Sequence, residues 1–357
     1  MNKLFLGDAF EILPAIEDKS VDLIFVDPPY FMQTDGKLIR VEGKEFDGID
    51  EHWDKFNSFN DYDEFTVNYL QECRRILKEN GSIWIIGSFQ NIYRIGKIMQ
   101  DMGFWILNDI IWKKTNPVPN FKGTRFTNSH ETLLWCSKNK TSKYTFNYKT
   151  MKHLNGGKQM GSVWEIPICQ GNERIKINGK KAHPTQKPQK LLYNIILSSS
   201  KPGDVVLDPF MGVGTTPAVA KMLGRKYIGI EKEKTYFEVA EKRVENTKFI
   251  DIPLHRNVLD IKPPKADIKD MIKKGYFKTG EYFYDKKNNK AKLTQKGHLN
   301  DGSQELSIHK MAAKLLNKIN HNGWEYWFVE RNKRLVPIDE IRKEYRKREL
   351  GYVKKAI

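Results

Sequence analysis

Four consecutive residues, Asp27-Pro28-Pro29-Tyr30, combine groups that could act on a planar amine. The two prolines remove two N–H donors and hold the backbone extended, so their carbonyl oxygens become fixed acceptors. The Asp27 carboxylate adds an acceptor, and the Tyr30 ring offers a face for stacking. Because the lone pair of a nucleobase amine is delocalised into the ring, hydrogen bonds to Asp27 and to the Pro28 carbonyl would stabilise the charge that develops on its nitrogen. An ordinary Pro-Pro turn is the alternative, since short motifs match by chance.

A second candidate site follows the apolar run at residues 205–207 and reads Asp208-Pro-Phe-Met-Gly-Val-Gly-Thr-Thr216. Gly212 and Gly214 let the backbone approach a ligand closely while the next helix begins. Glu231 ends the following strand, about 20 positions on, where an acidic residue binds ribose hydroxyls. Because the turn lacks the full dinucleotide spacing and no P-loop lysine follows, the pattern favours a nucleoside cofactor without a pyrophosphate.

Two further polar segments are candidates for the same site. Asp8 ends the first expected strand, where it could bind a cofactor or equally cap the following helix. In His183-Pro-Thr-Gln-Lys-Pro188, Thr185 can cap a turn and Lys187 is placed to hold a carboxylate near a helix start. Taken alone, this segment could be a plain helix-entry loop.

Alternating strand and helix patterns position these motifs. Apolar runs predict strands at 3–6, 21–26, 83–87, 106–112, 205–207 and 227–231, and helical spacing predicts helices at 10–16, 65–77, 92–102 and 191–199. The alternation predicts an α/β fold with a parallel sheet, whose ligands bind at the carboxyl ends of the strands. Both motifs follow such strand ends.

Polar insertions interrupt the alternation at about 31–60, 113–128 and 140–182. Long loops of this kind are usually functional or disordered, so solvated mobile loops are the alternative. Arg125 is predicted to contact a base edge, since arginine to guanine is the commonest such pair, and Arg40 is a second candidate. These segments are interpreted as DNA-recognition loops.

Length and charge indicate a second domain. The 357 residues carry 61 Lys and Arg against 44 Asp and Glu, a net charge of +17, and residues 261–357 hold 24 basic and 12 acidic residues of these totals. A Pro-containing linker at 253–264 separates a domain at 1–252 from a basic domain at 265–357. Such a charge suggests a polyanionic partner, although a Lys-rich proteome gives the same excess. Residues 322–328 predict a hairpin-like turn entering an aromatic strand, with the aromatics mostly in the core.

Cysteine and histidine spacing predicts no metal site. The three cysteines lack paired spacing and no histidine pair has i,i+4 spacing, so a reducing cytosol fits best. An N-terminal signal segment and an 18-residue apolar stretch are both missing from the sequence, and neither secretion nor membrane insertion is expected.

The three motifs, in the order Asp27, His183, Asp208, resemble the β-class DNA amino-methyltransferases, in which the catalytic motif precedes the cofactor motif. The similarity continues through 120–125 (Asn-Phe-Lys-Gly-Thr-Arg), 307–309 (Ser-Ile-His) and 322–324 (Asn-Gly-Trp). The chain thereby resembles the GANTC-specific adenine-N6 methyltransferases, both the cell-cycle-regulated type and the methylases paired with restriction enzymes. The resemblance implies a circularly permuted Rossmann-like methyltransferase sheet with a small basic C-terminal domain.

The resemblance also implies a function: methyl transfer from S-adenosylmethionine to the N6 amine of an adenine flipped out of double-stranded DNA, by a cytoplasmic, nucleoid-associated bacterial homodimer. It makes the catalytic residues Asp27, Pro28, Pro29 and Tyr30. Its cofactor residues are Asp8, Ala9, Asp27, Thr185, Lys187, Asp208, Phe210, Gly212, Gly214, Thr215 and Glu231. The predicted DNA-binding residues are Asn120, Lys122, Arg125, Ser307, His309, Asn322 and Trp324 in the segments of similarity, and Arg40 and Arg174 in the polar insertions.

One position departs from the family pattern, since Met211 stands where a Phe or another bulky group is usual. The alternative functions are cytosine-N4 methylation, whose motif more often begins with Ser than Asp, and a non-catalytic basic DNA-binding protein. The complete acceptor set at 27–30 argues against the second.

Overall fold

The computed structural model describes residues 2–31, 37–39, 45–47, 54–120 and 123–353. The chain forms two compact units, Met1–Asp260 and Ile261–Ile357.

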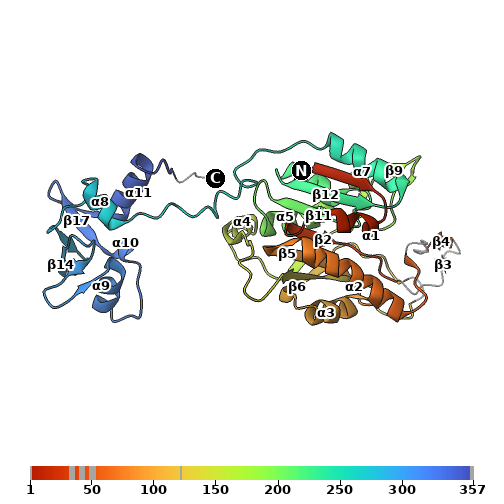
Figure 1. The fold of residues 1–357 in the computed structure, drawn as a ribbon, viewed down its shortest axis with the longest axis horizontal. Coiled ribbons are helices and arrows are strands. Elements are labelled where there is room, and N and C mark those ends of the chain that lie inside the picture. The colour runs from red at the N-terminus through yellow and green to blue at the C-terminus, as the bar shows by residue number, and fades with distance from the viewer. Residues whose placement is uncertain (1, 32–36, 40–44, 48–53, 121–122, 354–357) are drawn as a thin grey trace. The chain divides into compact units, whose positions relative to one another are not determined.

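The first unit is built on an eight-stranded sheet (Figure 1). In spatial order the strands are β1 (Asn2–Leu6), β12 (Lys226–Glu231), β11 (Val205–Asp208), β2 (Val21–Val26), β5 (Leu77–Gly87), β7 (His130–Ser137), β6 (Trp105–Lys114) and β8 (Val163–Ile166). Five neighbouring strands, β1, β12, β11, β2 and β5, pair in parallel. Strand β7 is antiparallel to both its neighbours, and β8 is parallel to β6. The predicted α/β class is confirmed.

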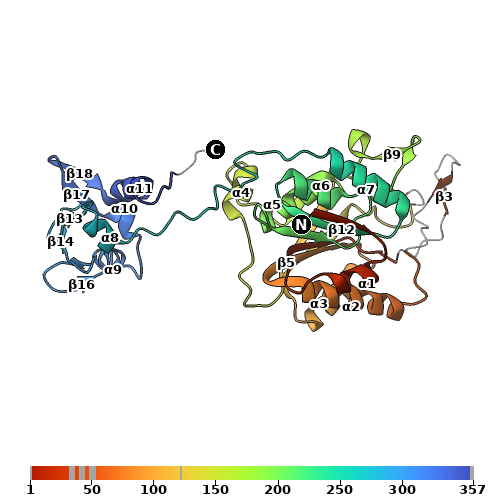
Figure 2. The same cartoon turned by 45° about the horizontal axis from the view of Figure 1, so that its top comes forward.

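Both faces of the sheet are covered by helices, which explains the unbroken apolar runs (Figure 2). Ile24 and Val26 pack in one core cluster with α2 (Phe59–Ile76) and α3 (Ile92–Asp101). Leu23 and Phe25 point the other way and pack with α5 (Gln189–Ser199) and α6 (Thr215–Met222). These four side chains are at most 1% exposed, so each contributes about 1.5–3 kcal/mol of burial.

Two predicted helices differ at their ends. The helix predicted at 65–77 begins at Phe59, because the Ser58 hydroxyl accepts a hydrogen bond from the Asp61 backbone N–H and caps it. The helix predicted at 10–16 is only α1 (Ala9–Ile12), which continues as a 3₁₀ turn, η1 (Leu13–Ala15), containing Pro14.

The remaining elements of the first unit are short hairpins and covering helices. They are β3 (Lys37–Ile39), β4 (Glu45–Asp47), α4 (Tyr148–Leu154), η3 (Gly171–Glu173), β9 (Lys176–Ile177), β10 (Lys180–Lys181) and α7 (Lys234–Asn246).

The second unit is a six-stranded antiparallel sheet with four helices around its own core. The strands, in spatial order, are β16 (Glu305–Leu306), β15 (Leu299–Asn300), β14 (Lys290–Leu293), β13 (Tyr282–Tyr284), β17 (Phe328–Arg331) and β18 (Arg334–Pro337). The helices are α8 (Ile268–Lys273), α9 (Ile308–Leu315), α10 (Gly323–Tyr326) and α11 (Ile338–Arg348).

The hairpin-like turn predicted at Asn322 is wrong. Asn322 instead caps α10 by accepting a hydrogen bond from the Trp324 N–H at 3.2 Å, and the aromatic strand follows that helix. A Cβ at Gly323 would lie 2.4 Å from the Ile308 carbonyl oxygen, so glycine is required here by the close approach of α9.

Within the described residues, no helix combines the length and apolar character that crossing a bilayer requires. The same residues contain no cluster of three or more His, Cys, Asp or Glu side chains with metal-binding geometry.

Candidate active site and cofactor pocket

The strand order brings the catalytic and cofactor motifs together. β2 and β11 are neighbours in the sheet, with Leu23 opposite Val206 and Ile24 opposite Leu207, so Asp27 and Asp208 end adjacent parallel strands. A cavity of about 330 Å³ opens at these strand ends. Every residue predicted as catalytic or cofactor-binding lines this cavity except Gly214, and Phe65, His183 and Tyr236 line it as well.

The glycine turn needs both of its glycines. Gly212 and Gly214 have φ angles of +52° and +75°, which side chains with a Cβ rarely adopt. Gly214 is also the N-cap of α6, and a Cβ there would lie 2.8 Å from the Ala240 Cβ. Gly214 therefore does not line the cavity itself, but its conformation and its close contact with α7 position the turn that does.

Two acidic side chains on the cofactor side have raised pKa values. The Asp208 carboxylate accepts hydrogen bonds from the Phe210 N–H at 3.0 Å and the Thr216 hydroxyl at 2.5 Å, yet burial raises its pKa to about 7. Burial also raises the pKa of Glu231 to about 7, although its Oε1 accepts a hydrogen bond from the Glu233 N–H at 2.7 Å. Hydrogen bonds from neutral donors such as ribose hydroxyls would stabilise the ionised form of these carboxylates and oppose the effect of burial.

Asp8 performs the capping role weighed from the sequence while lining the cavity beside the buried Ala9. Its Oδ1 accepts a hydrogen bond from the Phe10 N–H at 2.9 Å, and its Oδ2 is 2.8 Å from the Lys232 Nζ.

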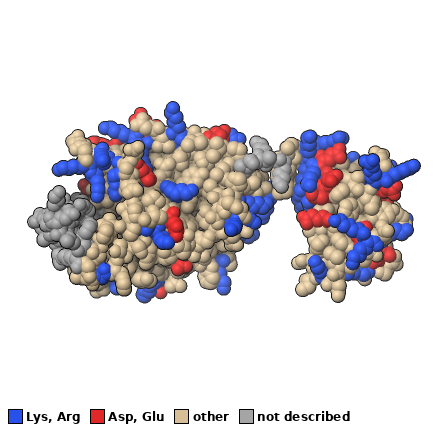
Figure 3. Space-filling view, turned by 180° about the vertical axis from the view of Figure 1, so that it is seen from behind, with Lys and Arg blue, Asp and Glu red and all other residues tan. Residues whose placement is uncertain are grey.

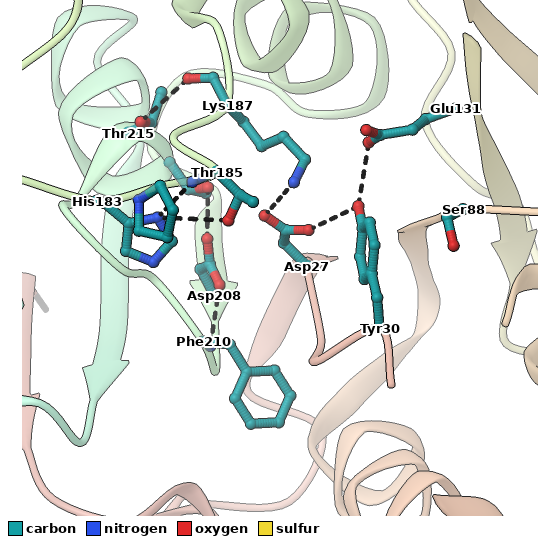
Figure 4. Close-up of polar contacts among 12 residues, drawn as sticks. Asp27, Tyr30, Ser88, Glu131, His183, Thr185, Lys187, Asp208, Phe210 and Thr215 are labelled. Carbon is teal, nitrogen blue, oxygen red and sulfur yellow. Dashed lines mark hydrogen bonds and ion pairs between the residues drawn. The ribbon is translucent and has the colours of Figure 1, made fainter. Parts of the chain in front are cut away.

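Asp27 is the centre of a polar network (Figure 4). The Lys187 ammonium donates to its Oδ2 at 2.7 Å, and the Tyr30 hydroxyl lies 3.1 Å from its Oδ1. The same ammonium lies 5.1 Å from the centroid of the Tyr30 ring. The segment at 183–188 thus supplies the counter-charge of the Asp27 carboxylate as well as part of the cavity lining.

The turn that carries Tyr30 is fixed by residues that the sequence reasoning missed. The Asp54 Oδ1 accepts from the backbone N–H of Tyr30 at 2.5 Å and of Phe31 at 2.8 Å. The Pro29 carbonyl accepts a hydrogen bond from the Tyr62 hydroxyl at 2.9 Å. The carbonyl that the sequence analysis assigned to the amine is the other one, that of Pro28. No sequence pattern links Asp54, 24 residues on, to this turn.

Glu131 is a second residue that the sequence reasoning missed. Its Oε2 lies 3.1 Å from the Tyr30 hydroxyl, and its Oε1 accepts from the Lys114 ammonium at 2.7 Å. Because β7 runs antiparallel, its first residues lie at the edge where the parallel strands end. The sequence signal would have been a charged residue opening an apolar strand.

Burial and charge determine the ionisation of this network. Burial raises the pKa of Asp27, and Lys187 opposes that shift. Burial also acts on Glu131, but Lys187 and Lys114 outweigh it and lower the Glu131 pKa. The pKa of Lys187 is raised because Asp27 and Glu131 outweigh its desolvation, and burial with both carboxylates raises the Tyr30 pKa well above 10.0. At neutral pH Lys187 is charged, Glu131 is ionised and Tyr30 keeps its proton.

His183 is a neutral side chain at the cavity wall. Burial lowers its pKa to about 3, and its Nδ1 accepts a hydrogen bond from the Thr185 N–H at 3.2 Å. A Cβ at Gly212 would lie 3.4 Å from its Nε2, so the imidazole packs against the glycine turn. The Thr215 hydroxyl, in the first turn of α6, lies 3.4 Å from the Lys187 carbonyl oxygen. This contact links the glycine turn to the segment at 183–188.

Arg174, predicted to bind DNA, lies against the segment at 183–188 that lines the cavity. Its guanidinium donates to the carbonyl oxygens of Cys169 at 3.1 Å, His183 at 2.9 Å and Pro184 at 3.2 Å. It therefore connects the end of η3, just before β9, to the segment that holds Thr185 and Lys187.

The other predicted DNA residues of the first unit divide into described and undescribed positions. Arg40 and Lys122 lie outside the described residues. Asn120 is half-buried, and Arg125 is exposed with its guanidinium 5.7 Å from the centroid of the Phe89 ring.

The predicted DNA residues of the second unit have structural partners. Ser307 caps α9 by accepting from the Lys310 N–H at 3.3 Å, and the His309 Nδ1 accepts from the Gly323 N–H at 2.9 Å. Trp324 is 7% exposed in the core, with the Arg342 guanidinium 4.7 Å from its ring centroid. Ser307, His309 and Trp324 also line a pocket together with Lys265, Lys269, Lys296 and Arg346.

Comparison with known proteins places this arrangement in context. Residues 21–242 match the family model described as DNA methylase, and residues 255–350 match the model described as Restriction Enzyme Adenine Methylase Associated. The chain is 58% identical to the type II methyltransferase M.HinfI of Haemophilus influenzae, over 97% of each chain. It is 47% identical to the type II methyltransferase M2.DpnII of Streptococcus pneumoniae, over 68% of this chain and 90% of that protein.

Two solved structures are similar to the first unit's architecture. The M1.HpyAVI–SAM complex has a TM-score of 0.51 and 30% identity, covering 68% of this chain and 99% of that one. The cytosine-N4-specific PvuII DNA methyltransferase has a TM-score of 0.55 at 20% identity, covering 72% and 90%, and shows a shared fold.

Proposed function

Since the chain belongs to the DNA methylase family, as an S-adenosylmethionine-dependent DNA methyltransferase, we propose that its target is the N6 amine of an adenine flipped out of double-stranded DNA, in the sequence GANTC. One observation carries the proposal: the Asp27 carboxylate ends its strand beside the cofactor cavity, held by Lys187 at 2.7 Å. The adenine target and the GANTC site are further supported by the resemblance to the GANTC-specific enzymes and by the match of the second unit.

The residues of the site fit the cofactor by their chemistry. Asp208 is a buried carboxylate and Glu231 a half-buried one, both suited to neutral hydrogen-bond donors, and the Gly212 turn leaves room for a close backbone approach. Bound S-adenosylmethionine supplies an electrophilic methyl group on a sulfonium. Asp27 and the Pro28 carbonyl orient the amine and stabilise its developing charge, while the Tyr30 ring stacks on the base.

Residues 261–357 are proposed to hold DNA. They carry a charge of +12 within the total of +17, and in Figure 3 Lys and Arg side chains are scattered over the visible face of this unit, with acidic and uncharged residues among them. Each lysine or arginine that neutralises a phosphate releases condensed counterion, which favours binding at low salt. A homodimer and association with the nucleoid are further proposals, supported by the family resemblance and by the basic charge.

The test is incubation with labelled S-adenosylmethionine and duplexes that contain GANTC or a scrambled site, followed by nucleoside analysis. Label in N6-methyladenine from the GANTC duplex alone is expected. Label in N4-methylcytosine would move the enzyme to the alternative amine, and no label in either nucleoside would refute amine methylation.

Asp27→Ala provides the mechanistic arm of this test. The carboxylate acts on the amine rather than on phosphates, so DNA affinity should survive while the single-turnover rate falls about 10²-fold or more. Full activity of the variant would exclude the assigned role.

A further inference from the structure

The Tyr30 hydroxyl lies between two carboxylates. Its oxygen is 3.1 Å from the Asp27 Oδ1 and 3.1 Å from the Glu131 Oε2 (Figure 4). Each carboxylate uses its other oxygen for a lysine, Lys187 at 2.7 Å from Asp27 and Lys114 at 2.7 Å from Glu131. Each acidic group therefore binds one lysine, and the tyrosine hydroxyl is their shared neighbour.

A hydroxyl has one proton and donates fully to one acceptor at a time. If the Tyr30 proton points to Asp27, it occupies a lone pair that the incoming amine needs. If it points to Glu131, the Asp27 Oδ1 faces only the lone pairs of the tyrosine oxygen. The second orientation leaves Asp27 the stronger acceptor for an N–H group.

On this geometry, and resting on the proposed amine methylation, we propose that Glu131 is a positioning residue that accepts the hydrogen bond of the Tyr30 hydroxyl when the amine enters and so leaves the Asp27 Oδ1 to the amine. The exchange needs only rotation of the hydroxyl hydrogen, because both acceptors are already at the same distance. Glu131 is not among the described residues that line the cavity, and in this proposal it acts through Tyr30.

The charges that face this network come from several parts of the sheet edge. Around the Tyr30 hydroxyl, four of these charges are Lys114 on β6, Glu131 on β7, Asp27 after β2 and Lys187 before α5, and a fifth, Asp208, ends β11 beside Asp27. Glu131 raises the pKa of Asp27 and the Tyr30 hydrogen bond lowers it. Loss of the Glu131 charge and loss of the Tyr30 hydroxyl should therefore shift the Asp27 pKa in opposite directions.

The first experiment measures single-turnover methyl transfer at saturating S-adenosylmethionine and duplex. Glu131→Gln keeps the size of the side chain but removes its charge, and it should slow transfer about ten- to a hundredfold, the range for a hydrogen bond to a charged acceptor. In a Tyr30→Phe background no hydroxyl competes for Asp27, so the same substitution should change the rate less than about twofold. An equal slowing in both backgrounds would overturn the proposal.

Glu165→Gln is the matched control. It makes the same change in the adjacent pair Lys113–Glu165, whose side chains are 55% and 62% exposed. Its rate should equal that of the unsubstituted enzyme.

The second experiment uses Tyr30→Phe alone and stands even if Glu131→Gln does not fold. In the free enzyme the lost hydroxyl should raise the Asp27 pKa, so the acidic limb of kcat/KM moves to higher pH. In the ternary complex the hydroxyl already points to Glu131, so the acidic limb of the single-turnover rate should stay in place. Equal shifts of both limbs, or complete loss of transfer, would overturn the proposal.

Failure of this inference is distinct from failure of the proposed function. If the unsubstituted enzyme transfers no methyl group to DNA, the function is refuted. If it methylates DNA and the two backgrounds respond equally to Glu131→Gln, only the role of Glu131 is refuted.

Discussion

The Lys187 ammonium lies 2.7 Å from the Asp27 Oδ2, although 160 residues separate the two in the chain. Their side chains are 7% and 19% exposed, so water screens the pair weakly. Removing either partner leaves the other charge buried and uncompensated, which is far more costly than the net value of the pair.

Lys187→Met should therefore impair catalysis in a pH-dependent way. Asp27 must be ionised to accept from the amine, so activity is present above its pKa and lost as the pH falls through it. Lys187 lowers that pKa, and its loss should move the acidic limb of the single-turnover rate to higher pH, with about a tenfold loss or more at pH 7. Lys190→Met, at an exposed position nearby, is the control, and an unmoved limb would contradict the assignment.

Glu231→Gln should weaken S-adenosylmethionine binding by about 1–3 kcal/mol, because ribose hydroxyls would lose a charged acceptor. Burial raises the pKa of Glu231 to about 7, so the carboxylate form grows as the pH rises through 7. The S-adenosylmethionine affinity of the unsubstituted enzyme, measured by calorimetry, should rise between pH 6 and 8. The variant should show a smaller rise, because Asp208 still ionises in this range. An identical pH dependence in both proteins would exclude Glu231 as the titrating acceptor.

Arg174→Ala should act on the cofactor rather than on DNA. The guanidinium donates to three backbone carbonyls, two of them in His183-Pro184, so its loss should loosen the segment and weaken S-adenosylmethionine binding several-fold, roughly one hydrogen bond's contribution. Lys176→Ala, at an exposed position two residues further on in β9, should leave cofactor affinity unchanged. A loss of DNA affinity with normal cofactor binding would restore the DNA role predicted from sequence.

Arg125→Ala should relax specificity at one base of the site and cost about 1–3 kcal/mol on the correct sequence. Its guanidinium is exposed, 5.7 Å from the centroid of the Phe89 ring, and is therefore accessible to a base edge. Competition binding with single-base variants of the duplex measures the effect. Uniform weakening on all sequences would identify a phosphate contact instead.

A shortened protein ending at Asp260 should bind S-adenosylmethionine, because every residue assigned to chemistry or cofactor lies in the first unit. Its DNA affinity should fall, and the slope of log affinity against log salt should flatten by about 0.9 for each phosphate that the shortened protein no longer neutralises. Unchanged affinity and slope would mean that residues 261–357 serve another purpose, such as dimerisation.

Within the second unit, Trp324→Ala should unfold the module. The ring is 7% exposed in the core and lies beside Arg342, and large aromatic truncations in cores cost about 3–5 kcal/mol. Circular dichroism of the full-length variant measures this. A folded variant with DNA binding weakened by about 1–3 kcal/mol would instead indicate a base contact.

The sequence was informative where a local pattern decides the structure. The strand at 21–26 has the predicted bounds, because its apolar run stops at a proline pair that cannot continue a ladder. Glu131 and Asp54 were missed because their roles depend on strand direction and on a contact across the chain, which no short pattern encodes. At Asn322 the local turn signal was overridden, since the close approach of Ile308 also demands a glycine at 323 and the asparagine caps a helix.

The pairing of β2 with β11 affects how the protein folds as well as where its site lies. The Asp22 Oδ2 accepts from the Val205 N–H at 2.9 Å across 183 residues of sequence, so the centre of the sheet closes only after a long loop has been ordered. Such non-local pairing slows folding. During synthesis, the amine-binding turn leaves the ribosome long before the strand that completes the cofactor cavity. A chain stopped before β12 would therefore carry Asp27 and Tyr30 without Glu231, the acceptor proposed for the ribose hydroxyls of the methyl donor.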